Sequence, residues 1–161
     1  MTAAEHARTS RGDIVGAMRD SAAIDDFAAL LRFHTRHKLL LMSRSPAALN
    51  ELGRLVANAR KHSLAAVVES YMKILHETLE RPATRGSHVN ALQHMAGYFR
   101  DLLADEEHAE VTKAIAAFGA GRTELDTPLA LIRRHATEHK VAYLLDQVYF
   151  DESAAAELHR D

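Results

Sequence analysis

The chain has 161 residues and a mass of 17.8 kDa; 47% of its residues are hydrophobic, 26% are charged, and its formal net charge is −2. These values are typical of one globular domain that can bury its own core. The absence of cysteine excludes disulfides, iron–sulfur clusters, cysteine-ligated zinc and thiol catalysis.

Residues 1–20 contain no apolar run of the kind found in signal peptides or membrane spans, and they predict a flexible N-terminal segment. Residues 21–161 are then expected to form one helical domain. We therefore expect a cytoplasmic protein that has no membrane contact.

Apolar residues recur at helical spacing through this domain, and no strand alternation or internal repeat interrupts them. The expected helices run from about Ser21 or Asp25 to Ser43, from Ser45 to Leu79, from about His88 to Ala104, from Glu106 to Phe118 and from Thr127 to about His139, with an extension over Val141 to Phe150. The second helix is expected to kink or split at Gly53 or at residues 60–63. The prediction is an all-α protein, a compact single-domain bundle of about six helices.

The first of these helices carries polar side chains inside its apolar stripe. On a helical wheel of about 100° per residue, Phe27, Leu31, His34, Lys38 and Leu41 fall within roughly 40° of one line. A lysine in such a stripe must reach water or meet an anion. The stripe therefore indicates a site as well as a core.

The helix that begins near His88 also has two distinct faces. Leu92, Ala96 and Phe99 form an apolar stripe, which we expect to pack against Leu31 and Leu41 of the first helix. Its other face offers polar residues and Gly97, a position that fits either a ligand or a plain helix crossing. The candidate ligand pocket comprises His34, Lys38, His88, Asn90, Gln93, His94 and Tyr98.

The small net charge hides a strong asymmetry. Residues 32–62 hold seven Lys/Arg against one acid, a net charge of +6, and residues 81–100 hold three Arg and no acid, a net charge of +3. Residues 101–110 hold five acids and no Lys/Arg, a net charge of −5. If the two basic segments share a face, they form a positive patch; a mixed, solvated surface is the alternative.

A histidine motif raises the question of a metal. Residues 135–139, HATEH, match the H-x-x-E-H signature of inverted zinc peptidases. Those enzymes need a further ligand from a helix well downstream, and only 22 residues follow His139. We therefore predict surface histidines, with no metal and no other cofactor. Because no nucleophile–base pair or phosphate-binding loop is evident, we also do not expect an enzyme, although catalysis in the His/Lys/Asn pocket stays open.

Five blocks of sequence carry a resemblance to a known family. They are RFHTRHKLLLMSRSP (32–46), ELGRLV (51–56), HVNALQHMAGYF (88–99), PLALIRRH (128–135) and YLLDQVYF (143–150), in order across about three quarters of the chain. The chain resembles the YbgA-like family, long catalogued as a domain of unknown function. It departs from the family pattern before Pro128, where relatives often carry a further proline, and at Ala136, where an aromatic residue or histidine is common.

The resemblance implies a role on RNA. YbgA-like domains occur alone or fused behind an iron–sulfur domain similar to thiouracil desulfidase. The fused proteins remove sulfur from thiolated uridine in transfer RNA, and their YbgA-like part is thought to hold the RNA. This chain has no cysteine for a cluster, so the resemblance implies RNA binding without the desulfidase chemistry.

We therefore expect RNA, and transfer RNA in particular, as the partner. Arg and Lys neutralise phosphates, and with aromatic residues at only 6% a structured RNA held by its backbone fits better than a stacked single strand. The candidate nucleic-acid-binding residues are Arg32, Arg36, His37, Lys38, Arg44, Arg85, Arg133 and Arg134. Two alternatives are a small-ligand or enzyme site that binds an anion in the pocket above, and an adaptor that recruits a separate desulfidase chain.

Overall fold

The computed structural model describes the backbone of residues 3–150 and the side chains of residues 12–150, and this part of the chain is all-α. The α helices are α1 (Ala3–Ser21), α2 (Phe27–Arg44), α3 (Pro46–Ala57), α4 (Leu64–Leu79), α5 (Arg85–Ala96), α6 (Asp105–Gly119), α7 (Asp126–Glu138) and α8 (Ala142–Leu145), with 3-10 turns η1 (Ala59–Lys61), η2 (Gly97–Phe99) and η3 (Val148–Phe150). The predicted fold class is confirmed, with eight α helices in the described part instead of about six.

Side-chain caps fix where several helices begin. The Asp26 carboxylate accepts a hydrogen bond from the Ala29 amide at the start of α2, and the Ser45 and Ser63 hydroxyls do the same for α3 and α4. The long second helix of the prediction splits at η1, before Ser63, and it runs unbroken through Gly53.

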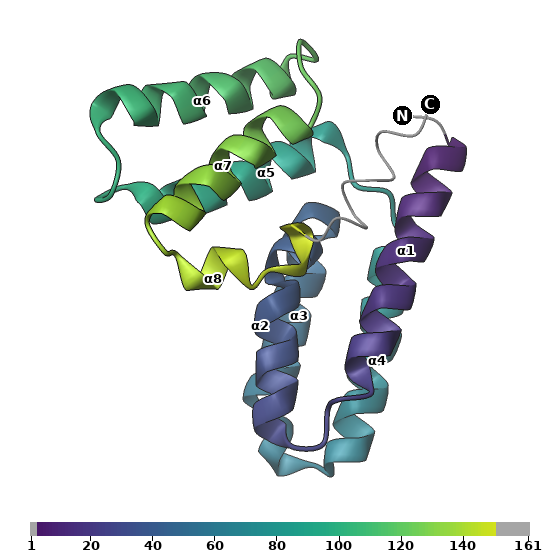
Figure 1. Ribbon diagram of the computed structural model, residues 1–161. Helices are drawn as coiled ribbons and strands as arrows, with labels where there is room; N and C mark the ends of the chain where they lie inside the picture. Colours follow the sequence, from purple (N-terminus) through teal and green to yellow (C-terminus); the bar gives the residue numbers. More distant parts are fainter. Residues whose placement is uncertain (1–2, 151–161) are drawn as a thin grey trace.

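The helices form two groups that meet on α2 (Figure 1). Helices α1 to α4 run up and down beside one another, and α5, α6 and α7 pack together as a second group with α8 beneath them. Helix α2 contacts α3, α4, α5 and η3, so it is the element through which the two groups share one core.

The predicted packing of α2 on α5 is present, but with a different face of α2. Leu41, Leu92 and Phe99 are buried, whereas Leu31 is 53% exposed. The buried face of α2 includes Leu30 and not Leu31. Helices α4 and α5 cover this face, which is rotated away from the predicted stripe of Phe27, Leu31, His34, Lys38 and Leu41. The expectation that Leu31 belongs to the core is therefore wrong.

Residues 3–21 form helix α1, although the sequence of residues 1–20 predicts a flexible segment. The helix packs along α4, and its Ala17 is buried. An ion pair joins Asp13 of α1 to Arg44 of α2, and both side chains are almost fully buried. Residues 151–161 of the predicted domain lie outside the described residues. Within the described part, no helix combines the length and apolarity needed to cross a bilayer.

Candidate nucleic-acid interface

Several of the predicted phosphate-binding arginines are used inside the protein to cap helix ends. Arg44 is 4% exposed and donates to the backbone carbonyls of Leu79 and Arg81, where α4 ends. Arg85 donates to the Phe118 carbonyl at 2.7 Å near the end of α6. The last carbonyls of a helix have no hydrogen-bond donor within the helix, so a guanidinium that reaches them supplies the missing hydrogen bonds.

Two of these guanidinium groups also lie over aromatic rings. Arg85 lies 4.6 Å from the centroid of Phe118, and Arg133 lies 5.5 Å from that of Phe150 while donating to the Phe150 carbonyl. Such cation–π contacts tie α5 to α6 and α7 to η3. Arg44, Arg85 and Arg133 therefore stabilise the fold.

Two further candidates lie in surface ion pairs. Arg36 is 3.3 Å from Asp146 and 3.7 Å from Asp20. Arg134 is 3.4 Å from Glu110 and 3.9 Å from Glu138. A phosphate that bound Arg36 or Arg134 would have to displace these carboxylates, although exposed pairs of this kind are weak.

His37 is not available to RNA. Its side chain is 1% exposed, it stacks on Phe33 with ring centroids 4.0 Å apart, and its Nδ1 is 2.7 Å from the Phe33 carbonyl oxygen. His37 therefore belongs to the core between α2 and its neighbours. The expectation that His37 contacts RNA is wrong, because its ring is buried.

Arg32 and Lys38 remain on the surface of α2, Arg32 exposed and Lys38 partly exposed. Among the described residues neither has an ion pair. Three exposed cations that the candidate set omitted lie on α3 and η1: Arg54, Arg60 and Lys61. All three fall within residues 32–62, the segment of net charge +6.

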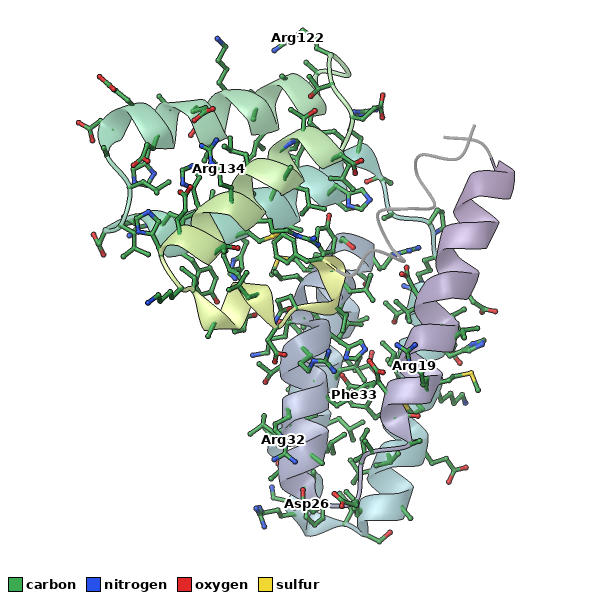
Figure 2. The ribbon with its side chains drawn as sticks, viewed as in Figure 1. Arg19, Asp26, Arg32, Phe33, Arg122 and Arg134 are labelled. Atoms are coloured by element: carbon green, nitrogen blue, oxygen red, sulfur yellow. The ribbon has the colours of Figure 1, made fainter. Side chains whose placement is uncertain are left out.

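We call Arg32, Arg54, Arg60 and Lys61 the basic end. Figure 1 shows η1 at the tip of the α1–α4 group, away from α5, α6 and α7, and Figure 2 labels Arg32 on the half of α2 nearer this tip. The Arg60 guanidinium lies 5.4 Å from the centroid of Phe27, which begins α2. Phe27 and Arg32 are five residues apart, about 8 Å along the helix. The four cations therefore lie around one end of the group.

The charge of the basic end is only partly offset. Residues 52–68 hold Arg54, Arg60 and Lys61 and no acid. Asp25 and Asp26 lie beside Phe27, Glu51 lies one turn before Arg54 on α3, and all three are exposed, so the local charge falls from +4 to +1. The result is a weakly positive surface.

An open hollow of about 640 Å³ adjoins this surface. It lies between α2 and the connection from α1, and its lining includes Asp20, Ile24, Arg32, Arg36 and Asp146. His34 and Lys38 are not part of its lining, so the concave site that the structure contains is not the predicted ligand pocket.

The seven residues of the predicted ligand pocket do not converge. His34 faces α4, where its Nδ1 is 2.8 Å from the Tyr71 hydroxyl. His94 lies on the outer face of α5 against Tyr98, which stacks on Tyr143 of α8 with ring centroids 4.9 Å apart. The physical reason is that Leu92 and Met95 occupy the face of α5 that meets the core.

The other members of that pocket are also separate. Asn90 and Gln93 are exposed, and the His88 Nδ1 is 2.5 Å from the Tyr149 hydroxyl. His34 is moreover unsuited to bind an anion at neutral pH. Burial, with smaller contributions from the charges of Lys38 and His37, lowers the pKa of His34 from 6.5 to about 4, so its ring is neutral.

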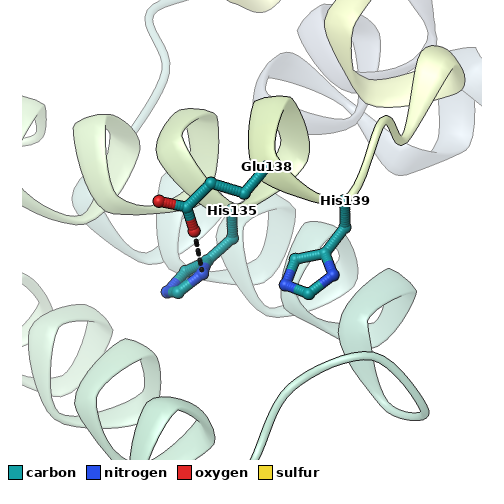
Figure 3. A group of neighbouring side chains, drawn as sticks. All are labelled: His135, Glu138 and His139. Atoms are coloured by element: carbon teal, nitrogen blue, oxygen red, sulfur yellow. Dashed lines mark ion pairs between the residues drawn. The ribbon is translucent and has the colours of Figure 1, made fainter.

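The HATEH motif is only partly on the surface. Glu138 is about half exposed, but His135 is fully buried in a T-shaped contact with Phe99, which corrects the prediction of surface histidines. The missed signal is helical spacing, because Leu131, Ile132 and His135 share a face of α7. Figure 3 shows both imidazoles and the Glu138 carboxylate at the end of α7.

Comparisons with known proteins agree on a family. The family model described as "Protein of unknown function (DUF1722)" matches residues 38–153. The chain is 30% identical to "Uncharacterized protein YbgA" of Escherichia coli (strain K12) over 124 residues, 76% of this chain and 73% of that protein. No solved structure matches the chain significantly. The segment matched by the family model includes the α3 and η1 residues of the basic end.

Proposed function

The chain belongs to the DUF1722 family and is YbgA-like, and on that premise we propose that it is an RNA-binding module that holds transfer RNA at its basic end. The module contributes no desulfidase chemistry, since the sequence contains no cysteine that could ligate a cluster. The observation that carries the proposal is the basic end itself, where four exposed cations lie without an ion pair among the described residues.

The physics of the basic end suits an RNA backbone. Lys and Arg that neutralise phosphates release condensed counterions, and this supplies a large, sequence-independent part of the binding free energy. The four side chains come from α2, α3 and η1, and side-chain caps at Asp26 and Ser45 fix where α2 and α3 begin. A cationic surface carried by helices fits the backbone of a folded RNA better than it fits a single strand.

The link to thiolated uridine rests on the resemblance. In the fused relatives a desulfidase domain adjoins a YbgA-like domain, and we extend that arrangement to two chains. This protein then presents transfer RNA to a separate desulfidase chain. Sequencing of RNA that copurifies with the tagged protein checks the link, because transfer RNAs that carry thiolated uridine should be enriched over those that lack it.

A second candidate function is the binding of a small anion, and the hollow beside Arg32 and Arg36 favours it. Its volume of about 640 Å³ is within the range of small-molecule sites. The anionic group of a ligand bound there would replace Asp20 and Asp146 as the ion-pair partner of Arg36. Competition separates the two functions, since a small anion that fills only the hollow leaves binding to Arg54, Arg60 and Lys61 intact.

The test compares two variants of equal charge change. The basic-end variant carries Arg54→Gln, Arg60→Gln and Lys61→Gln. The control variant carries Arg100→Gln, Lys113→Gln and Arg122→Gln, three exposed cations on or beside α5 and α6. With fluorescently labelled transfer RNA at low salt, we expect the basic-end variant to bind about tenfold or more weakly and the control to resemble the wild type. Equal losses in both variants would mean that net charge, not this surface, governs binding.

A further inference from the structure

The end of α7 gathers three metal-ligating side chains that the proposed RNA function does not use. His135, Glu138 and His139 are spaced i, i+3 and i+4, which places them on one face of a helix. One potential ligand atom from each lies within 4.8 Å of the others. The two imidazole rings have centroids 6.3 Å apart, and Figure 3 shows them on the same side of the helix.

A second, independent observation points to a ligand at this place. His135 is fully buried, and its Nδ1 has no hydrogen-bond partner among the described residues. The Glu138 carboxylate is 3.4 Å from this nitrogen, near enough for an ion pair but outside hydrogen-bond geometry. A buried polar atom without a partner costs about 1 to 3 kcal/mol, so such atoms in native proteins call for an explanation.

We propose that His135, Glu138 and His139 bind a divalent transition-metal ion of the zinc class. The ligand atoms are His135 Nδ1, a Glu138 carboxylate oxygen and an imidazole nitrogen of His139. Zinc at about 2.1 Å from each of two tetrahedral ligands holds them about 3.4 Å apart. The His135–Glu138 distance of 3.4 Å already meets this condition. Glu138 and His139 are both partly solvent-exposed and can rotate to close the remaining gap.

The chemistry of the site favours a divalent cation. Two imidazoles and one carboxylate suit zinc, and the carbonyl end of α7, with His139 as its C-cap, adds a partial negative charge that favours a cation. Glu138 acts here as a ligand and not as the base of a zinc peptidase. The ion would link the exposed end of α7 to the core, because the buried ring of His135 contacts Phe99 of η2.

Arg134 limits the affinity of this site. Its Nη2 is 3.4 Å from His135 Nε2, and its Nε is 3.9 Å from a Glu138 carboxylate oxygen. When Nδ1 binds the metal, Nε2 carries the ring proton, so the guanidinium must turn away toward Glu110, with which it already pairs. Removal of this positive charge should therefore tighten metal binding.

The experiment titrates the metal-stripped full chain with Zn²⁺ by calorimetry and with Co²⁺ by visible absorption. We expect one equivalent to bind, with the intense d–d bands of tetrahedral Co²⁺. His139→Asn should weaken binding about tenfold or more, and Arg134→Gln should strengthen it several-fold. The matched control is His62→Asn, an exposed histidine outside the site, which should bind like the wild type.

Two results would overturn the proposal. The first is wild-type affinity no higher than that of His139→Asn, and the second is an equal loss in His62→Asn. The site does not depend on RNA binding, so the titration is interpretable whether or not transfer RNA binds. His139→Asn alters a partly exposed residue at a helix end, and circular dichroism confirms that it folds before the titration.

Discussion

Acidification should destabilise this protein through one buried histidine, His34. Its ring is 3% exposed and shares a hydrogen bond of 2.8 Å with the hydroxyl of fully buried Tyr71. Burial, then Lys38 and then His37, lower the pKa of His34 from 6.5 to about 4. The folded state therefore keeps His34 neutral over a pH range in which the unfolded chain protonates it.

The sign and size follow from proton linkage. Above about pH 6.5 neither state binds the proton, and the contribution to stability is complete. As the pH falls from 6.5 toward 4, the unfolded state binds the extra proton, and the free energy of unfolding falls by about 1.4 kcal/mol per pH unit. Between pH 7.5 and pH 4.5 the loss from His34 alone is about 2.5 kcal/mol.

The assay is urea unfolding at these two pH values for the wild type and His34→Asn. Asparagine keeps a polar group near the position of Nδ1 but does not titrate in this range. Ten other histidines contribute to the wild-type curve and to the variant equally, so the difference between the two pH dependences isolates His34. A difference below about 0.5 kcal/mol would refute the account of a buried, neutral His34.

Three other substitutions test the packing. Gly53 lies inside α3, and a Cβ there would lie 3.7 Å from His34 Nε2 on α2, an ordinary van der Waals contact, so Gly53→Ala should stabilise by about 0.5 to 1 kcal/mol in chemical denaturation. Gly121 has a φ of +73°, so Gly121→Ala should instead destabilise by about 1 kcal/mol, and a gain would contradict the turn geometry. Asp13→Ala removes the carboxylate beside buried Arg44 and should lower the free energy of unfolding by about 3 kcal/mol. Hydrogen exchange in residues 12–21 should also become faster. Unchanged exchange would show that α1 is anchored elsewhere.

Local signals in the sequence predicted the helices well because their causes are local. Ser45 and Pro46 start α3, and the hydroxyl of Ser45 does cap the Ala48 amide. The split before Ser63 was also among the predicted alternatives. The orientation of α2 was harder, because Leu31 and Leu30 are equally apolar. Which of them is buried depends on the positions of α4 and α5, which no local pattern determines.

The candidate site was less predictable for a physical reason. An arginine that caps a distant helix and one that binds phosphate look the same in sequence. Arg44 and Arg85 find their acceptors at Leu79 and Phe118, more than 30 residues away along the chain. The charge count indicated a basic segment, but only tertiary structure separates the arginines used by the fold from those of the basic end.

The salt dependence of transfer-RNA binding tests the central claim most directly. A plot of log Kd against log salt concentration is measured from 50 to 300 mM for the wild type and for the variant with Arg54→Gln, Arg60→Gln and Lys61→Gln. If these three cations neutralise phosphates, the slope of the variant should be flatter by about 2 to 3. Identical slopes, or no binding of transfer RNA by the wild type at the lowest salt, would contradict the claim that the basic end holds RNA.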